Sequence, residues 1–263
     1  MQLLISTKKE CKMSLVGTYE PINTLKPVAE NIWIVDGPII HMQQFGLNVP
    51  FPTRMTIIRL GDGSLFLHSP TSPDESLLKS IDGLGPVKHL VSPNKIHYAS
   101  IHPWSQHYPD AKCWASPGVR ERTEKHGIEI HFNQNLTDSP EEIWASELDQ
   151  LIFRGGRFMD EVVFFHKSSR TLILADLIEN FERSKLKEPI GWLVKLAGNL
   201  DPDGKLPIDL RMTYWGRHKI ACKYLRRMID WQPERIILSH GRWYEKNGAK
   251  ELKRAFRWLS CSL

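Results

Sequence analysis

The most constraining feature of the sequence is a set of three short apolar runs that each end in a polar loop. The runs "KHLV", "TLILA" and "RIIL" precede polar loops over residues 92–104, 176–182 and 239–244. Short apolar runs with such boundaries predict buried β-strands. In layered α/β folds, ligand sites collect in the loops beyond strand ends. We therefore expect these three loops to carry the functional residues.

The rest of the chain alternates between predicted strands and helices in two similar halves. Each half contains a predicted β-hairpin, over residues 54–70 and 161–177, in which two apolar runs flank a short polar turn. Helices are predicted over residues 72–85, 216–231 and 248–259. This order predicts an α/β fold in which two mixed β-sheets pack together and helices lie outside, an αββα sandwich.

The chain of 263 residues is long enough for one large domain with a full core. We expect residues 17–263 to form this single domain and residues 1–16 to be a flexible segment, with either Met1 or Met13 as the start. The N-terminal apolar stretch is too short for a signal-peptide core. No apolar run reaches ~18 residues, so we expect no membrane span.

The four cysteines, Cys11, Cys113, Cys222 and Cys261, are scattered along the chain without a CxxC pair. This spacing argues against a disulfide framework and against a zinc knuckle. It predicts four ordinary thiols and fits a reducing compartment. We therefore expect a cytoplasmic protein.

The net charge of +5 is distributed unevenly. Residues 183–263 hold 18 Lys and Arg against 8 Asp and Glu, whereas residues 1–182 hold 17 against 22. A basic C-terminal third fits either an anionic partner or a solvated helical face that keeps the protein soluble. The sequence has no basic stretch interleaved with aromatic residues and no recognition motif, so nucleic acid is not the expected partner.

The order of the polar loops resembles that of the metallo-β-lactamase fold, and specifically of its divergent branch, the DUF4336 family. The family motif Thr-His-x-His-x-Asp-His falls on "SPNKIHY" (92–98), and the later Gly-His segment before a hairpin falls on "GRFMDE" (156–161). The bridging aspartate falls on Asp176, and the last Gly-His falls on "SHG" (239–241). The resemblance covers nearly the whole chain and implies the same αββα sandwich.

Family members usually bind two metal ions, and the resemblance implies that one of the two sites is lost here. Its ligand positions hold Pro93, Lys95, Arg157 and Asp176. A proline and two cations cannot bind a metal ion. Lys95 and Arg157 would instead lie where that ion lies in the family, and they would pair with Asp176 or hold an anionic group of a substrate.

The second family site is better preserved. Its ligand positions hold His97, Tyr98, Asp176 and His240. Three of these, His97, Asp176 and His240, carry ordinary metal ligands. Two imidazoles and a carboxylate with an open position are an acceptable set for one zinc or iron ion. The resemblance therefore implies a rebuilt site for a single metal ion.

Several of these residues also have a structural interpretation. Asp176 ends an apolar strand, where a carboxylate commonly caps the next turn, and His97 lies in a loop, where an imidazole commonly bonds to backbone. Glu161 either forms a salt bridge with a nearby arginine such as Arg157 or acts as a ligand or a catalytic proton carrier. The insertion at about 184–217 forms either a lid over the cleft or a dimer surface.

Two functions of different class remain open. The first is a metal-dependent hydrolase with an unknown substrate, in which His97, Asp176 and His240 hold the ion. Lys95 and Arg157 would then stabilise negative charge in the transition state. The second is a non-catalytic, metal-free pseudoenzyme that binds an anion, with Asp176 salt-bridged to Lys95 or Arg157. Both predict a small anionic substrate or ligand, and both leave a homodimer open.

Overall fold

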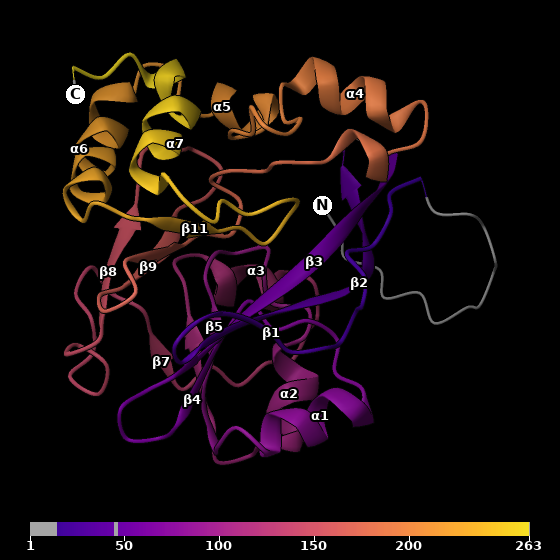
Figure 1. The fold of residues 1–263 in the computed structure, drawn as a ribbon, viewed down its shortest axis with the longest axis vertical. Helices are drawn as coiled ribbons and strands as arrows, with labels where there is room; N and C mark the ends of the chain where they lie inside the picture. Colours follow the sequence, from indigo (N-terminus) through magenta and orange to yellow (C-terminus); the bar gives the residue numbers. More distant parts are fainter. Residues whose placement is uncertain (1–14, 45–46, 263) are drawn as a thin grey trace.

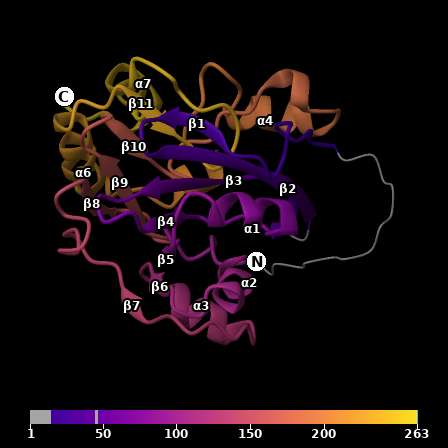
Figure 2. The same ribbon diagram turned by 60° about the horizontal axis from the view of Figure 1, so that its bottom comes forward.

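The computed structural model describes residues 15–44 and 47–262, and its strands form two β-sheets. The sheets pack face to face, and helices cover the outer face of each (Figures 1 and 2). Both sheets contain parallel and antiparallel pairs, so both are mixed. The predicted αββα sandwich is confirmed. The predicted flexible segment lies outside the described residues except for Leu15 and Val16.

The first sheet has seven strands in chain order. They are β1 (Lys26–Ala29), β2 (Ile32–Gln44), β3 (Leu47–Arg59), β4 (Leu65–His68), β5 (Val87–Ser92), β6 (Lys112–Ala115) and β7 (Gln134–Asn135). Strands β1 to β4 are antiparallel, and β4 to β7 are parallel. The parallel pairs need crossovers, which α1 (Glu75–Asp82), α2 (Ile101–His107) and α3 (Val119–Lys125) supply. Both β3–β4 and α1 were predicted from the sequence.

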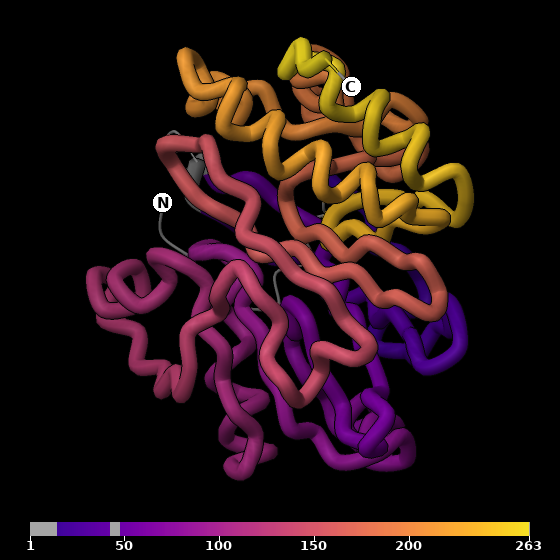
Figure 3. The backbone as a smooth tube through the Cα atoms, turned by 90° about the vertical axis from the view of Figure 1, so that its left-hand side faces the viewer, coloured from indigo at the N-terminus to yellow at the C-terminus, as the bar shows by residue number. Residues whose placement is uncertain are grey.

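The second sheet has four strands in the order β11-β10-β9-β8. They are β8 (Leu148–Phe153), β9 (Glu161–His166), β10 (Thr171–Ile173) and β11 (Arg235–Ile237). Strands β9 and β10 form the second predicted hairpin. The outer face is covered by α6 (His218–Asp230), α7 (Gly248–Ala255) and the short helix η2 (Arg257–Leu259), which Figure 3 shows in orange and yellow along one side of the molecule.

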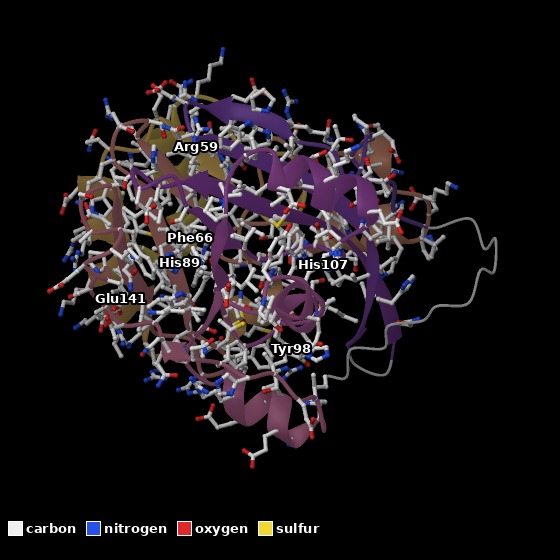
Figure 4. All side chains as sticks on the ribbon, turned by 90° about the horizontal axis from the view of Figure 1, so that it is seen from below. Arg59, Phe66, His89, Tyr98, His107 and Glu141 are labelled. Atoms are coloured by element: carbon white, nitrogen blue, oxygen red, sulfur yellow. A yellow bond between two sulfur atoms is a disulfide. The ribbon has the colours of Figure 1, made fainter. Side chains whose placement is uncertain are left out.

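The apolar core has three layers because both faces of each sheet are covered. Strand β9 shows the alternation: Val162 and Phe164 pack between the sheets, whereas Val163 and Phe165 pack against the helices. Figure 4 labels Phe66 and His89, whose rings lie 6.3 Å apart between the sheets. Burial on both faces explains why the strands read as continuous apolar runs.

The predicted insertion at 184–217 contains two α-helices and most of one short helix, and it lies beside the C-terminal helices (Figure 1). The elements are the short helix η1 (Arg183–Lys185), α4 (Ile190–Ala197) and α5 (Ile208–Met212). Large apolar side chains that are exposed cluster here: Trp192, Leu193, Leu196, Ile208, Met212 and Trp215. The lid and the dimer surface both stay predictions.

The prediction of four ordinary thiols is wrong. Cys222 on α6 and Cys261 after η2 form a disulfide, although they are 39 residues apart in the sequence. Packing of η2 against α6 brings them together, which sequence spacing does not reveal. Cys113 is free and buried, and Cys11 lies outside the described residues. The cysteine argument for a reducing compartment therefore fails.

The cytoplasmic location stays a prediction. Across residues 15–44 and 47–262, every helix is too short or too polar to cross a membrane.

Candidate metal centre

His240 follows β11 and is a buried residue of the candidate site. Its side chain is 3% exposed. Its Nδ1 lies 2.6 Å from the backbone carbonyl of Pro52, and a carbonyl only accepts, so Nδ1 carries a proton and donates. In the neutral imidazole, this bond leaves a lone pair on Nε2. That atom lies 3.1 Å from Oδ1 of Asp176.

His97 lies in the loop between β5 and α2 and faces the other oxygen of the same carboxylate. Its Nε2 is 3.0 Å from Oδ2 of Asp176 and 3.4 Å from Nε2 of His240. Its Nδ1 is 2.6 Å from the hydroxyl of Ser69, which follows β4. In metal sites, such a contact on the other ring nitrogen orients a histidine ligand toward the metal ion.

Asp176 lies just past β10 and connects the two rings. Its side chain is 3% exposed, and Oδ2 also accepts a hydrogen bond of 2.7 Å from Nδ2 of Asn94. Burial alone would raise the pKa of this carboxyl, but the His97 and His240 rings hold it well below its usual range. Asp176 also raises the pKa of His240 above its ordinary value, against the opposite effect of burial. The carboxylate is therefore charged.

Glu161, the first residue of β9, lies behind Asp176. Its Oε1 accepts from the backbone N–H of Ala175 at 2.8 Å, and its Oε2 accepts from that of Asp176 at 2.7 Å. Nδ2 of Asn94 donates to the same Oε2 at 3.1 Å. Burial and then the Asp176 charge raise the pKa of Glu161 to about 7. The predicted salt bridge to an arginine is wrong, because backbone N–H groups and an amide occupy this carboxylate instead.

Lys95 and Arg157 do not contact Asp176. The Lys95 ammonium lies 4.1 Å from the ring centroid of Phe158. Arg157 donates from Nη1 to the carbonyl of Trp215 at 2.9 Å. The ion pairs that the structure describes for Asp176 join it to histidines. The expected pairing of Asp176 with either cation is therefore wrong, because two imidazoles already face its oxygens.

Arg54, a residue of β3, holds the His240 loop in place. Its guanidinium is 3% exposed and donates to Oδ1 of Asp36 at 2.9 Å. It also donates to the carbonyls of Leu238 at 2.9 Å and Gly241 at 2.6 Å, which flank His240. This role of Arg54 was not predicted from the sequence.

Asn94 was missed altogether, although it lies inside the 92–98 motif. The only available signal was a polar residue between two family ligand positions, Pro93 and Lys95. Its amide bonds to both Asp176 and Glu161, as described above.

The three candidate ligands fit a metal ion. The ligand atoms of His97, Asp176 and His240 all lie within 4.8 Å of one another, and no other such group occurs in the described part of the chain. Tetrahedral bonds of about 2.1 Å would separate ligand atoms by about 3.4 Å. The two Nε2 atoms are 3.4 Å apart. Tyr98, at the remaining family position, is fully buried and packs in the core between the first sheet and its helices.

This sandwich, with its candidate ligands beyond the ends of β5, β10 and β11, defines a protein of the metallo-β-lactamase fold. The chain belongs to the DUF4336 family, described as a domain of unknown function, whose model matches residues 29–188. No curated protein matches the chain significantly.

Solved structures of low sequence identity share the fold. A metallo-β-lactamase from Pontibacter korlensis is 17% identical, with a TM-score of 0.60 over 90% of this chain and 98% of that chain. The mono-zinc form of the FIM-1 metallo-β-lactamase from Pseudomonas aeruginosa is 13% identical, with a TM-score of 0.59 over 93% and 96%. A metal-soaked Flv1 flavodiiron core from Synechocystis sp. PCC6803 is 12% identical, with a TM-score of 0.59 over 94% and 62%.

Proposed function

We propose that this protein is a metal-dependent hydrolase that holds one zinc or iron ion at His97, Asp176 and His240. The observation that carries the proposal is the orientation of His240. Because Nδ1 donates to Pro52, the lone pair of the neutral ring points at a carboxylate oxygen 3.1 Å away. Two electron-rich atoms at this distance repel each other unless a cation or a proton lies between them. A metal ion meets this need for both imidazoles together.

A metal ion bound here would polarise a substrate oxygen and lower the pKa of bound water toward ~7. The residues of the chain then have separate roles. Glu161 and Asn94 position Asp176, because both bond to it or to its backbone. Lys95 and Arg157, on the loops that lead to His97 and to Glu161, bind the anionic part of a small substrate. A direct proton-carrier role of Glu161 stays a prediction.

The alternative is the metal-free, anion-binding pseudoenzyme. Its expected ion pair between Asp176 and Lys95 or Arg157 is not formed, so the site would need a protonated His240 instead. A proton then lies between His240 and Asp176, and no metal binds. Metal content separates the two functions directly.

The test is elemental analysis of untagged protein purified without chelator and then exposed to Zn²⁺ or Fe²⁺. We expect about one ion per chain in the wild type. The Asp176→Asn variant keeps the shape of the side chain but loses its charge, so it should lose the metal. His102→Ala, which removes an exposed histidine outside the site, is the matched control and should keep it. Metal-free wild-type protein with an intact fold would refute the proposal.

Substrate binding is tested next with esters, lactones and phosphodiesters that carry a negative charge. The Lys95→Ala variant should raise KM and leave kcat unchanged, because the lysine contacts the anionic group rather than the reacting atoms. Lys88→Ala removes an exposed lysine from β5 and should change neither. An unchanged KM in Lys95→Ala would remove Lys95 from the proposed site.

A further inference from the structure

A cavity lined by cations lies at the C-terminal side of the molecule. Its volume is about 280 Å³. The charged and aromatic residues that line it are Asp203, Lys205, Arg211, Arg254, Arg257 and Trp258. They come from the insertion, from α7 and from η2. None of them belongs to the candidate metal centre.

The cations of this cavity outnumber its carboxylates. Arg254 is already paired, since Nε donates to Glu251 at 2.7 Å and Nη1 lies 3.7 Å from Asp203. By contrast, no ion pair that the structure describes joins Lys205, Arg211 or Arg257 to a carboxylate. Three cations therefore line one cavity without a direct ion pair among the residues that the structure describes, although the nearby charges of Asp203 and Asp209 act on Lys205 and Arg211.

The mutual repulsion of these cations is visible at Lys205. Burial lowers the pKa of the Lys205 ammonium, and the charge of Arg211 lowers it further. Arg254 and Arg257 act in the same direction, and Asp203 opposes them. An anion in the cavity would remove this repulsion.

Two buried donors of the lining residues also lack a partner. Nε of Arg211 and Nε1 of Trp258 have no hydrogen-bond partner within residues 15–44 and 47–262. Buried polar groups are nearly always paired, so these two unpaired donors are unusual among the lining residues.

We propose that this basic cavity binds a phosphate group. Guanidinium groups donate paired hydrogen bonds that match phosphate oxygens, and a dianion compensates several cations at once. The cavity is smaller than the roughly 300–1,000 Å³ typical of drug-sized ligands. It therefore suits inorganic phosphate or the phosphate group of a small ester.

The test is calorimetric titration of the whole protein with inorganic phosphate and, separately, with glycerol 3-phosphate. Lys205→Gln and Arg257→Gln should each weaken binding on the order of tenfold, because each removes a charge-assisted hydrogen bond. The matched control is Lys253→Gln, which removes an exposed charge from α7 outside the cavity. It should bind as the wild type does.

The two ligands distinguish the sources of the phosphate. Tighter binding of glycerol 3-phosphate supports a phosphorylated small molecule, and equal or tighter binding of inorganic phosphate supports the free ion. The proposal is overturned if neither ligand binds at millimolar concentration. It is equally overturned if Lys253→Gln weakens binding as much as Arg257→Gln does, since binding would then follow the general surface charge. Asp176→Asn should bind phosphate normally, which separates this site from the metal centre.

Discussion

Replacing Arg54 with Met should destabilise the fold strongly and loosen the metal centre. Arg54 forms a buried ion pair with Asp36 and donates to the two carbonyls that flank His240. Breaking a buried ion pair costs about 3–5 kcal/mol, since the remaining charge stays buried. Lys26 still pairs with Asp36 at 2.8 Å, which reduces this cost. The lost bonds to the carbonyls add to it, and we expect a net loss of about 4 kcal/mol.

Urea and thermal unfolding measure this loss. For a chain of this size, about 4 kcal/mol lowers Tm by roughly 8–16 °C. Arg59→Met is the matched control, because Arg59 lies on the same strand but is half-buried, and its guanidinium bonds to Oδ1 of Asn31 and lies over the Trp33 ring. It should cost about 1 kcal/mol. The reasoning is refuted if Arg54→Met costs no more than Arg59→Met. Folded Arg54→Met should also bind zinc about 10–100-fold more weakly, because His240 loses its support.

Three further changes have defined outcomes. Asn94→Ala should weaken zinc binding about 10–100-fold in a competition titration, and unchanged affinity would show that Asn94 does not position Asp176. Burial lowers the pKa of His89 from 6.5 to about 4, so its contribution to stability is complete above pH 6.5 and is lost as the pH falls toward 4. In urea unfolding, the His89→Asn variant should show a weaker dependence of the unfolding free energy on pH over that range, with a slope smaller by about 1.4 kcal/mol per pH unit. An unchanged slope would contradict this. Cys222→Ser should lower the unfolding free energy by about 2–4 kcal/mol in urea without reductant. Reductant should cause the same loss in the wild type. If it does not, the loss in the variant does not come from the disulfide.

The sequence by itself determined the sandwich and the loops that carry the candidate ligands. Continuous apolar runs and the breaks after them are local patterns, and each run needs burial on both faces. Strand ends at the same edge of layered sheets place their loops together. The resemblance to the DUF4336 family then singled out His97, Asp176 and His240 within these loops, and the structure brings their ligand atoms together.

Only the tertiary structure decided what surrounds these three residues. Arg54 reaches carbonyls 184 and 187 residues away in the sequence, and Cys222 pairs across 39 residues. Lys95 contacts an aromatic ring and Arg157 donates to a backbone carbonyl, so neither contacts Asp176. Hydrogen bonds and ion pairs of this kind depend on which loops meet in space and on which partner is already occupied. Local periodicity carries no information about either.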